Sequence, residues 1–169
     1  MSTSPLERVM RPGFLTRVLR ERVRRGLVAG VIAAAATAGA LLGLGRAHGA
    51  TFTLLNDAAH VLIGERARLV ESAHGVVTIL AMLVHVAVVL VWSVLFALLA
   101  GSLRGWRLVL AALVFTAAVV AIDLWLLPAS MRPGFETAMS VSELVLLYGI
   151  LAASLAFGVR ESRPAGALA

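Results

Sequence analysis

The sequence predicts an all-α membrane protein, a bundle of four transmembrane helices, and two observations support this fold class. First, 60% of the 169 residues are hydrophobic and only 14% are charged, with a mean hydropathy of +0.96. A soluble chain of this length has too much surface for its volume to bury so many apolar side chains. Second, charges are nearly absent from four segments, each long enough for the roughly 20 residues that a helix needs to cross a bilayer.

The transmembrane domain is expected at residues 26–159, between a basic segment (1–25) and a short tail (160–169). The first span has no charged residue, and the last two hold one acid each. We expect the four spans at about 26–45, 74–101, 107–128 and 138–159, with a loop over 46–73.

The basic segment is expected to form an amphipathic helix on the cytoplasmic leaflet. Apolar residues recur there at helical spacing among arginines: Phe14, Leu15, Val18, Leu19 and Val23. Such a helix binds an anionic lipid surface. A retained first span is favoured over a cleaved signal peptide, because the basic region is long and the apolar run exceeds the roughly 7–15 residues of a signal peptide.

Small residues mark the first span, with Gly26, Gly30 and Ala34 at four-residue steps and Gly39 and Gly43 on another face. Small side chains let helix backbones approach closely in lipid. Two interpretations stay open, which are packing within one bundle and association with a second copy or a larger membrane complex.

Arginine sets the expected orientation. All 15 basic residues are arginine, and eleven of them fall in the N-terminal segment, the turn between spans two and three, and the C-terminal tail. By the positive-inside rule, both termini are cytoplasmic and the loops at 46–73 and 128–138 face outward. We expect a multi-pass protein of the bacterial inner membrane. Because membrane-flanking arginines account for the net charge of +6, no nucleic-acid partner is predicted.

Several chemistries are excluded or unsupported. The chain has no cysteine, which excludes disulfides, thiolate ligands and cysteine nucleophiles. It also lacks a phosphate-binding glycine loop, a nucleophile elbow and the His-Glu-x-x-His motif of metalloproteases. No catalytic residue is therefore predicted, and the balance is against an enzyme.

The outward loop is expected to contain a helix over residues 51–63 that lies in the membrane interface and ends at Gly64. Asn56, Asp57 and His60 share its polar face, while Phe52, Leu55, Ala59, Leu62 and Ile63 share its apolar face. A second helix is expected to begin near Glu65 and continue into span two.

One pattern of candidate metal ligands occurs twice, because a carboxylate precedes an imidazole by three residues in Asp57–His60 and again in Glu71–His74. Residues three apart are neighbours on a helix, so each pair could hold one ion. Lone acids near the outer ends of spans three and four would complete a carboxylate-rich site of the di-iron or di-manganese kind. The full predicted set, suited to iron, manganese or zinc, is Asp57, His60, Glu71, His74, Asp123 and Glu143. The alternative is that each acid–histidine pair is an intrahelical contact.

The two acids within the spans have a second interpretation of their own. Ionisable groups in hydrocarbon are costly and often functional. However, His74 or Arg132 could pair with Asp123 or Glu143 as a structural contact.

His85 lies deepest, about 16 Å below His74 and near the bilayer centre. It is expected on an inward-facing stripe with Val89, Trp92 and Phe96. A haem would need a second ligand from a partner, since spans one, three and four contain no histidine. A proton relay and a neutral histidine bonded to a neighbouring helix are the alternatives.

Three features resemble small four-span bacterial inner-membrane proteins of unknown function, the YagU-like proteins. They are the Arg25-Gly26-Leu27-Val28-Ala29-Gly30 opening of span one, the amphipathic loop, and the series His85, Trp92 and Phe96. This resemblance covers about two-thirds of the chain, and it implies the topology but no catalytic residue. The absence of lysine and cysteine and the acid–histidine repeat depart from it.

Three functions remain open from the sequence. The first is a structural or accessory membrane protein, and the second is a metal-binding, redox-capable bundle. The third is a proton or small-solute pathway through His85 with Asp123 or Glu143.

Overall fold

The computed structural model describes residues 14–64, 75–128 and 132–162, and this part of the chain is helical with no strand. Four of its helices are long and apolar enough to cross a membrane, which confirms the predicted fold class. They are α2 (Phe14–Ala47), α5 (Gly75–Ala100), α6 (Trp106–Ala121) continued by the π-helical turn η3 (Ile122–Leu126), and α8 (Val141–Glu161).

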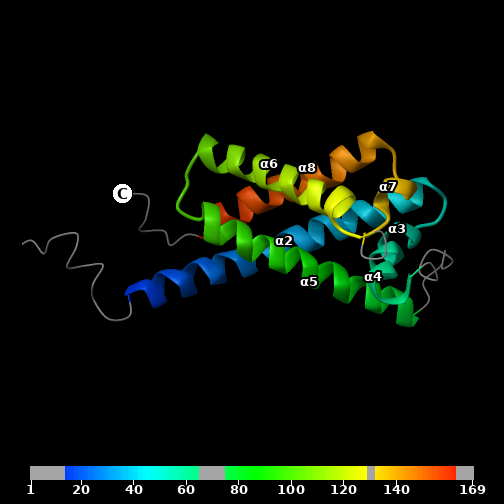
Figure 1. The fold of residues 1–169 in the computed structure, drawn as a ribbon, viewed down its shortest axis with the longest axis horizontal. Coiled ribbons are helices and arrows are strands. Elements are labelled where there is room, and N and C mark those ends of the chain that lie inside the picture. The colour runs from blue at the N-terminus through cyan, green and yellow to red at the C-terminus, as the bar shows by residue number, and fades with distance from the viewer. Residues whose placement is uncertain (1–13, 65–74, 129–131, 163–169) are drawn as a thin grey trace, which may run out of the picture.

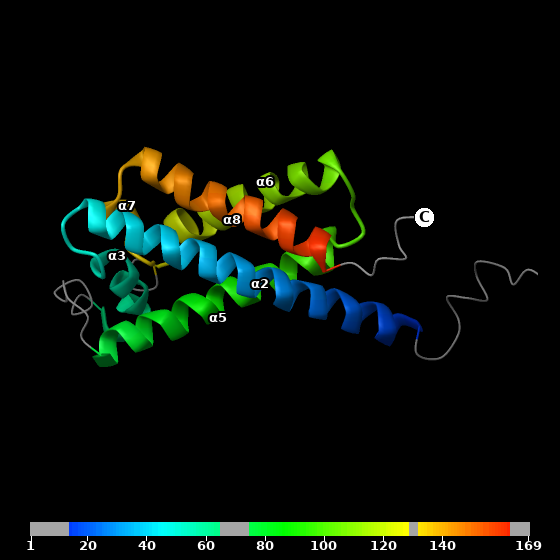
Figure 2. The same cartoon turned by 180° about the vertical axis from the view of Figure 1, so that it is seen from behind.

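The four long helices lie roughly side by side, with α2 between α5 and the α6–α8 pair (Figure 1, Figure 2). At one end, α2 and α6 begin and α5 and α8 end, and we call this the basic end. At the other end lie the short helices, which we call the loop end. The short helices are α3 (Thr53–Asn56), the 3₁₀ turn η1 (Asp57–Ala59), α4 (His60–Ile63) and α7 (Phe135–Ala138).

Helix α2 is longer than the predicted first span. It runs unbroken through 34 residues, which corresponds to about 51 Å, against about 30 Å for the hydrocarbon core. The expected amphipathic segment is therefore a continuation of the first span, with no break at residue 25. Its apolar side chains at Leu15 and Leu19 are exposed.

Small residues let α2 lie against both of its neighbours. A side chain at Gly26 would meet the Cα of Val94 on α5 at 2.6 Å, and one at Gly158 of α8 would meet the Cα of Ala29 at 2.5 Å. The interpretation that Gly26 packs within one bundle is therefore favoured for this face. On the other face, a Cβ atom added at Gly39 or Gly43 would meet no described atom within 4 Å.

Arginines of α2 bind the ends of two other helices at the basic end. Arg22 donates to the carbonyl of Leu98 at 2.7 Å and Arg25 donates to that of Gly101 at 3.5 Å, both at the end of α5. Arg24 donates to the carbonyl of Ser162, just after α8. The last carbonyls of a helix lack intrahelical donors, so cations stabilise them.

Helix α8 begins with a capping box. The Ser140 hydroxyl accepts from the backbone N–H of Glu143, and the Glu143 carboxylate accepts from the N–H of Ser140 at 2.8 Å. Two backbone donors without helical partners are satisfied in this way. The helix therefore begins at Val141, three residues after the predicted start of the span.

The segment of α3, η1 and α4 departs from the expected interfacial helix. It ends at Gly64 (φ 64°), as predicted. However, Asn56, Asp57 and His60 are buried, whereas Leu62 is 58% exposed. Leu55 and Ala59 of the expected apolar face are buried as well, and Ala58 and Ala59 pack with Ala81 of α5. Both faces of this segment are therefore covered between Leu54 and His60.

Candidate functional site

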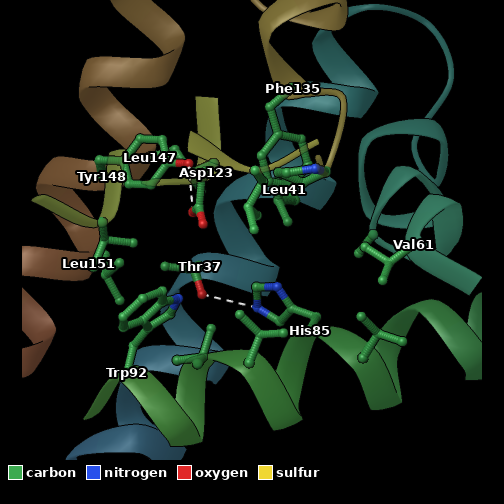
Figure 3. Close-up of a pocket in the computed structure, with 17 residues that line it drawn as sticks. Thr37, Leu41, Val61, His85, Trp92, Asp123, Phe135, Leu147, Tyr148 and Leu151 are labelled. Atoms are coloured by element: carbon green, nitrogen blue, oxygen red, sulfur yellow. Dashed lines mark hydrogen bonds between the residues drawn. The ribbon is translucent and has the colours of Figure 1, made fainter. Parts of the chain in front are cut away.

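A cavity of about 130 Å³ lies between α2, α5, α6–η3 and α8, and it extends toward the loop end. Most of its lining is apolar, including Leu41, Val89, Phe135 and Leu151. Polar side chains from four different helices also face it, as Figure 3 shows. They are Thr37 of α2, His85 and Trp92 of α5, Asp123 of η3 and Tyr148 of α8.

The His85 ring is bonded to α2, and the bonding partners define its tautomer. Its Nε2 lies 3.0 Å from the Thr37 hydroxyl and 3.3 Å from the carbonyl oxygen of Ala34. The Thr37 hydroxyl donates its own hydrogen to the Ala33 carbonyl at 2.7 Å, so it acts as an acceptor toward His85. Both neighbours of Nε2 therefore accept, and Nε2 carries the hydrogen. The other ring nitrogen, Nδ1, is then an acceptor.

Asp123 is held from α8, across the cavity from His85. The Tyr148 hydroxyl donates to Asp123 Oδ2 at 3.1 Å. Figure 3 shows this pair and the His85–Thr37 pair as separate contacts on the cavity wall. Asp123 lies in a π-helical turn, and π-turns in α-helices are frequent at functional sites. Arg132, one of the two partners expected for Asp123, instead donates to the carbonyls of Leu127 and Trp125. The other expected partner, His74, lies outside the described residues, so that pairing stays a prediction.

Trp92 completes the polar lining of the cavity. Its ring packs edge-on against Phe115 of α6, with centroids 6.1 Å apart, and its indole nitrogen points toward Thr37 (Figure 3). Two valines at the opposite wall, Val61 and Val88, are 39% and 44% exposed. The cavity therefore has an apolar rim on the outer surface of the bundle.

Beyond the cavity toward the basic end, the interior is closed by apolar packing. Ala29, Phe96, Ala97 and Leu155 are each fully buried there. Ser93 is also fully buried, and its hydroxyl donates back to the Val89 carbonyl of its own helix. The described residues thus contain no polar route from His85 to the basic end.

Glu143 is placed away from this cavity lining, by a contact that the sequence analysis missed. His48 Nε2 lies 2.6 Å from Glu143 Oε1, and this pair joins the end of α2 to the start of α8. The carboxylate also accepts from Ser140. Glu143 thus has structural partners in the described part of the chain.

The predicted metal set is described only in part, because Glu71 and His74 lie outside the described residues. Asp57 and His60 are buried, and His60 Nδ1 lies 3.1 Å from the carbonyl oxygen of Arg132. Among the residues that the structure does describe, no three histidine, aspartate or glutamate side chains gather closely enough to hold a metal ion. The six-residue site stays a prediction.

Comparison with models of known protein families, with curated proteins and with solved structures gives no match to this chain. The resemblance to YagU-like proteins therefore stays an expectation. Function has to be argued from the cavity itself.

Sequence patterns found some of these cavity residues and missed others. The inward stripe on span two correctly placed His85, Val89 and Phe96 in the interior. Thr37 and Tyr148 were missed, because single hydroxyl-bearing residues in an apolar helix carry no periodic signal. Only the pairing of helices brings Thr37 to His85, 48 residues away.

Proposed function

We propose that this chain is a multi-pass protein of a bacterial inner membrane, with both termini cytoplasmic, that binds a small apolar molecule with one polar group inside its bundle. The arginine distribution supports the orientation. The binding function rests on one observation, the cavity with polar groups from four helices around an apolar interior.

The size and lining of the cavity define the class of ligand. A dry cavity of about 150 Å³ in another protein binds benzene, and this cavity is of similar volume. The Nδ1 atom of His85 accepts a hydrogen bond, and it has no protein donor among the described residues. A small ring or short chain with a hydroxyl group satisfies both features. Ligand sites with a few polar groups in an apolar wall are typical of helix bundles.

The same structure favours binding over conduction. Apolar side chains close the interior between His85 and the basic end, so a proton or solute has no polar route across the described bundle. The exposed rim at Val61 and Val88 supports lateral entry from the lipid. Binding of a small molecule inside the bundle differs from the three functions that the sequence left open, and the cavity is the observation that supports it.

The test uses Trp92 as the reporter. The chain has three tryptophans, and Trp106 and Trp125 are exposed, so replacing these two with phenylalanine leaves one emitter beside the cavity. We expect 4-bromophenol, a ring with a hydroxyl and a heavy-atom quencher, to quench Trp92 fluorescence saturably in mild detergent. Val61→Phe, which fills the rim, should weaken this binding about tenfold or more.

Leu62→Phe is the matched control. It adds the same ring at the position next to Val61, but Leu62 does not line the cavity. It should bind 4-bromophenol as the parent does, and His85→Leu should weaken binding by removing the acceptor. Quenching that rises linearly, or that is equal in Val61→Phe and Leu62→Phe, would mean partition into the micelle and would rule out the proposed site.

A further inference from the structure

A second concave surface lies on the opposite side of α8 from α2, between α6 and α8. We call it the α6–α8 groove. Its volume is about 440 Å³, and it is lined by apolar and small residues, with one arginine at its end. The lining residues are Gly105, Leu108, Val109 and Leu113 of the α6 side, and Gly149, Ala152, Ala153, Ala156, Phe157 and Arg160 of α8.

Small residues of α8 form the floor of the groove, and Ala152 among them is buried. Ala153 is exposed, and a side chain at Gly149 would meet no described atom within 4 Å. Leu113 and Val109 form the α6 wall and are 53% and 51% exposed. In a membrane, such an open apolar groove along two helices is in contact with lipid acyl chains.

The length of the groove matches one leaflet. Its α8 wall runs from Arg160 to Gly149, eleven residues along the helix. At 1.5 Å per residue this is about 16 Å, close to half of the roughly 30 Å hydrocarbon core. The groove therefore extends from the basic end to about the middle of the helix pair. There a further hollow between α6 and α8 shares Leu113, Gly149 and Ala152 with it and continues toward the loop end.

The positive charges near the groove favour a lipid with an anionic headgroup. Arg160 lines the end of the groove. Arg104 and Arg107 flank the lining residue Gly105 in the sequence, and the Arg107 guanidinium lies over the Trp106 ring. All three residues are exposed, and the Glu161 carboxylate lies 3.4 Å from Arg160. Helix α6 also begins here with no side-chain cap, so the positive end of its dipole adds to the field. Basic pockets between membrane helices bind anionic headgroups.

The described part of the loop end has two arginines, Arg46 in the last turn of α2 and Arg132, and neither lines the groove. Arg132, near η3, is bonded to the carbonyls of Leu127 and Trp125. We infer that the α6–α8 groove holds an acyl chain of an anionic phospholipid from the leaflet at the basic end, with the phosphate bound by Arg160 and Arg107. This site is separate from the cavity at His85.

The experiment is native mass spectrometry of the purified chain with added phosphatidylglycerol or with phosphatidylcholine of the same acyl chains. We expect one phosphatidylglycerol to be retained at concentrations where phosphatidylcholine is not. The double variant Arg107→Gln/Arg160→Gln should weaken this binding at least about tenfold, from the roughly 1 kcal/mol that each arginine near an anionic surface contributes. Ala153→Leu should also weaken it, by filling the floor of the groove.

Two matched controls isolate the site. Arg17→Gln/Arg20→Gln removes the same charge from exposed positions of α2, and Ala118→Leu adds the same bulk to an exposed position outside the groove. Both should bind phosphatidylglycerol as the parent chain does, and circular dichroism should show unchanged helix content in all four variants.

Three results would overturn the inference. One is equal retention of the two lipids, and another is an equal loss in the control charge pair, which would indicate a diffuse charge effect. The third is a dimer that Ala153→Leu dissociates while lipid retention is unchanged, which would assign the groove to a second copy of the chain.

Discussion

At the scale of single residues, Thr37 has two roles at once. Its hydroxyl donates to the Ala33 carbonyl of its own helix and accepts from His85 of α5. A hydroxyl in a membrane helix that bonds only its own backbone adds little to the contact between helices, whereas here it joins α2 to α5. The bond also orients the imidazole, so that Nδ1 is left as the acceptor for a ligand.

We therefore predict that Thr37→Val lowers the free energy of unfolding by about 1 kcal/mol, the usual range for a hydrogen bond between membrane helices. Valine keeps the shape of threonine but removes the acceptor for Nε2. The measurement is unfolding in mixed micelles followed by circular dichroism. Thr37→Ser keeps the oxygen and should be close to the parent. A loss in Thr37→Ser with none in Thr37→Val would show that packing of the methyl group, not the bond, matters here.

At the scale of elements, the start of α8 depends on Ser140. Its hydroxyl accepts from the N–H of Glu143, and Glu143 returns the bond and also contacts His48. Replacing a serine cap by alanine typically costs about 1 kcal/mol. Ser140→Ala should therefore lower the free energy of unfolding by about that amount and fray the first turn of α8.

Amide hydrogen exchange at Leu144, whose N–H donates to the Ser140 carbonyl, is the local measurement for this change. Exchange should be faster in Ser140→Ala and nearly unchanged in Ser140→Thr, which keeps the hydroxyl. Protection that is the same in alanine and threonine variants would contradict a role for the cap.

The arginines of α2 provide a second prediction about elements. Arg22 bonds the Leu98 carbonyl near the end of α5, whereas Arg17 has no bonded partner among the described residues. Arg22→Met keeps the length of the side chain but leaves this carbonyl without its donor. We expect a loss of about 1 kcal/mol in the free energy of unfolding for Arg22→Met. Arg17→Met should change it little, and equal effects would show that total charge, not the contact, stabilises this end.

Elements also show what sequence could predict here. A run of roughly 20 apolar residues has few alternatives to a spanning helix, so all four spans were found. The burial of the polar face of residues 51–63 was not predicted, because an amphipathic pattern shows that two faces differ but not that other helices cover both of them. At the loop end, polar Asn56 and Asp57 are buried against the other helices, a choice that depends on tertiary packing.

Contacts between distant residues were the least predictable. His48 and Glu143 are 95 residues apart, and Tyr148 and Asp123 are 25 apart. Each pair exists because of the register in which two helices pack, and that register is set by close approaches such as Gly158 against Ala29. The candidate acids were therefore recognisable as unusual, while their partners were not.

At the scale of the whole molecule, the basic end combines the arginines that cap α5 and α8 with those beside the α6–α8 groove. Concentrating both at one end links folding to the predicted orientation. The positive-inside rule acts on the same side chains that satisfy helix ends. Reversing the molecule in the membrane would move all of them across the bilayer.

The orientation itself is testable because the chain contains no cysteine. Thr16 and Ala47 are exposed near opposite ends of α2, and Ser162 follows α8. In intact bacterial spheroplasts, a membrane-impermeant maleimide should label Ala47→Cys, while Thr16→Cys and Ser162→Cys should react only after permeabilisation. The reason is that Thr16 and Ser162 lie at the basic end, which the positive-inside rule assigns to the cytoplasm. The reverse labelling would contradict this orientation and would place the basic end, with its α6–α8 groove, in the outer leaflet.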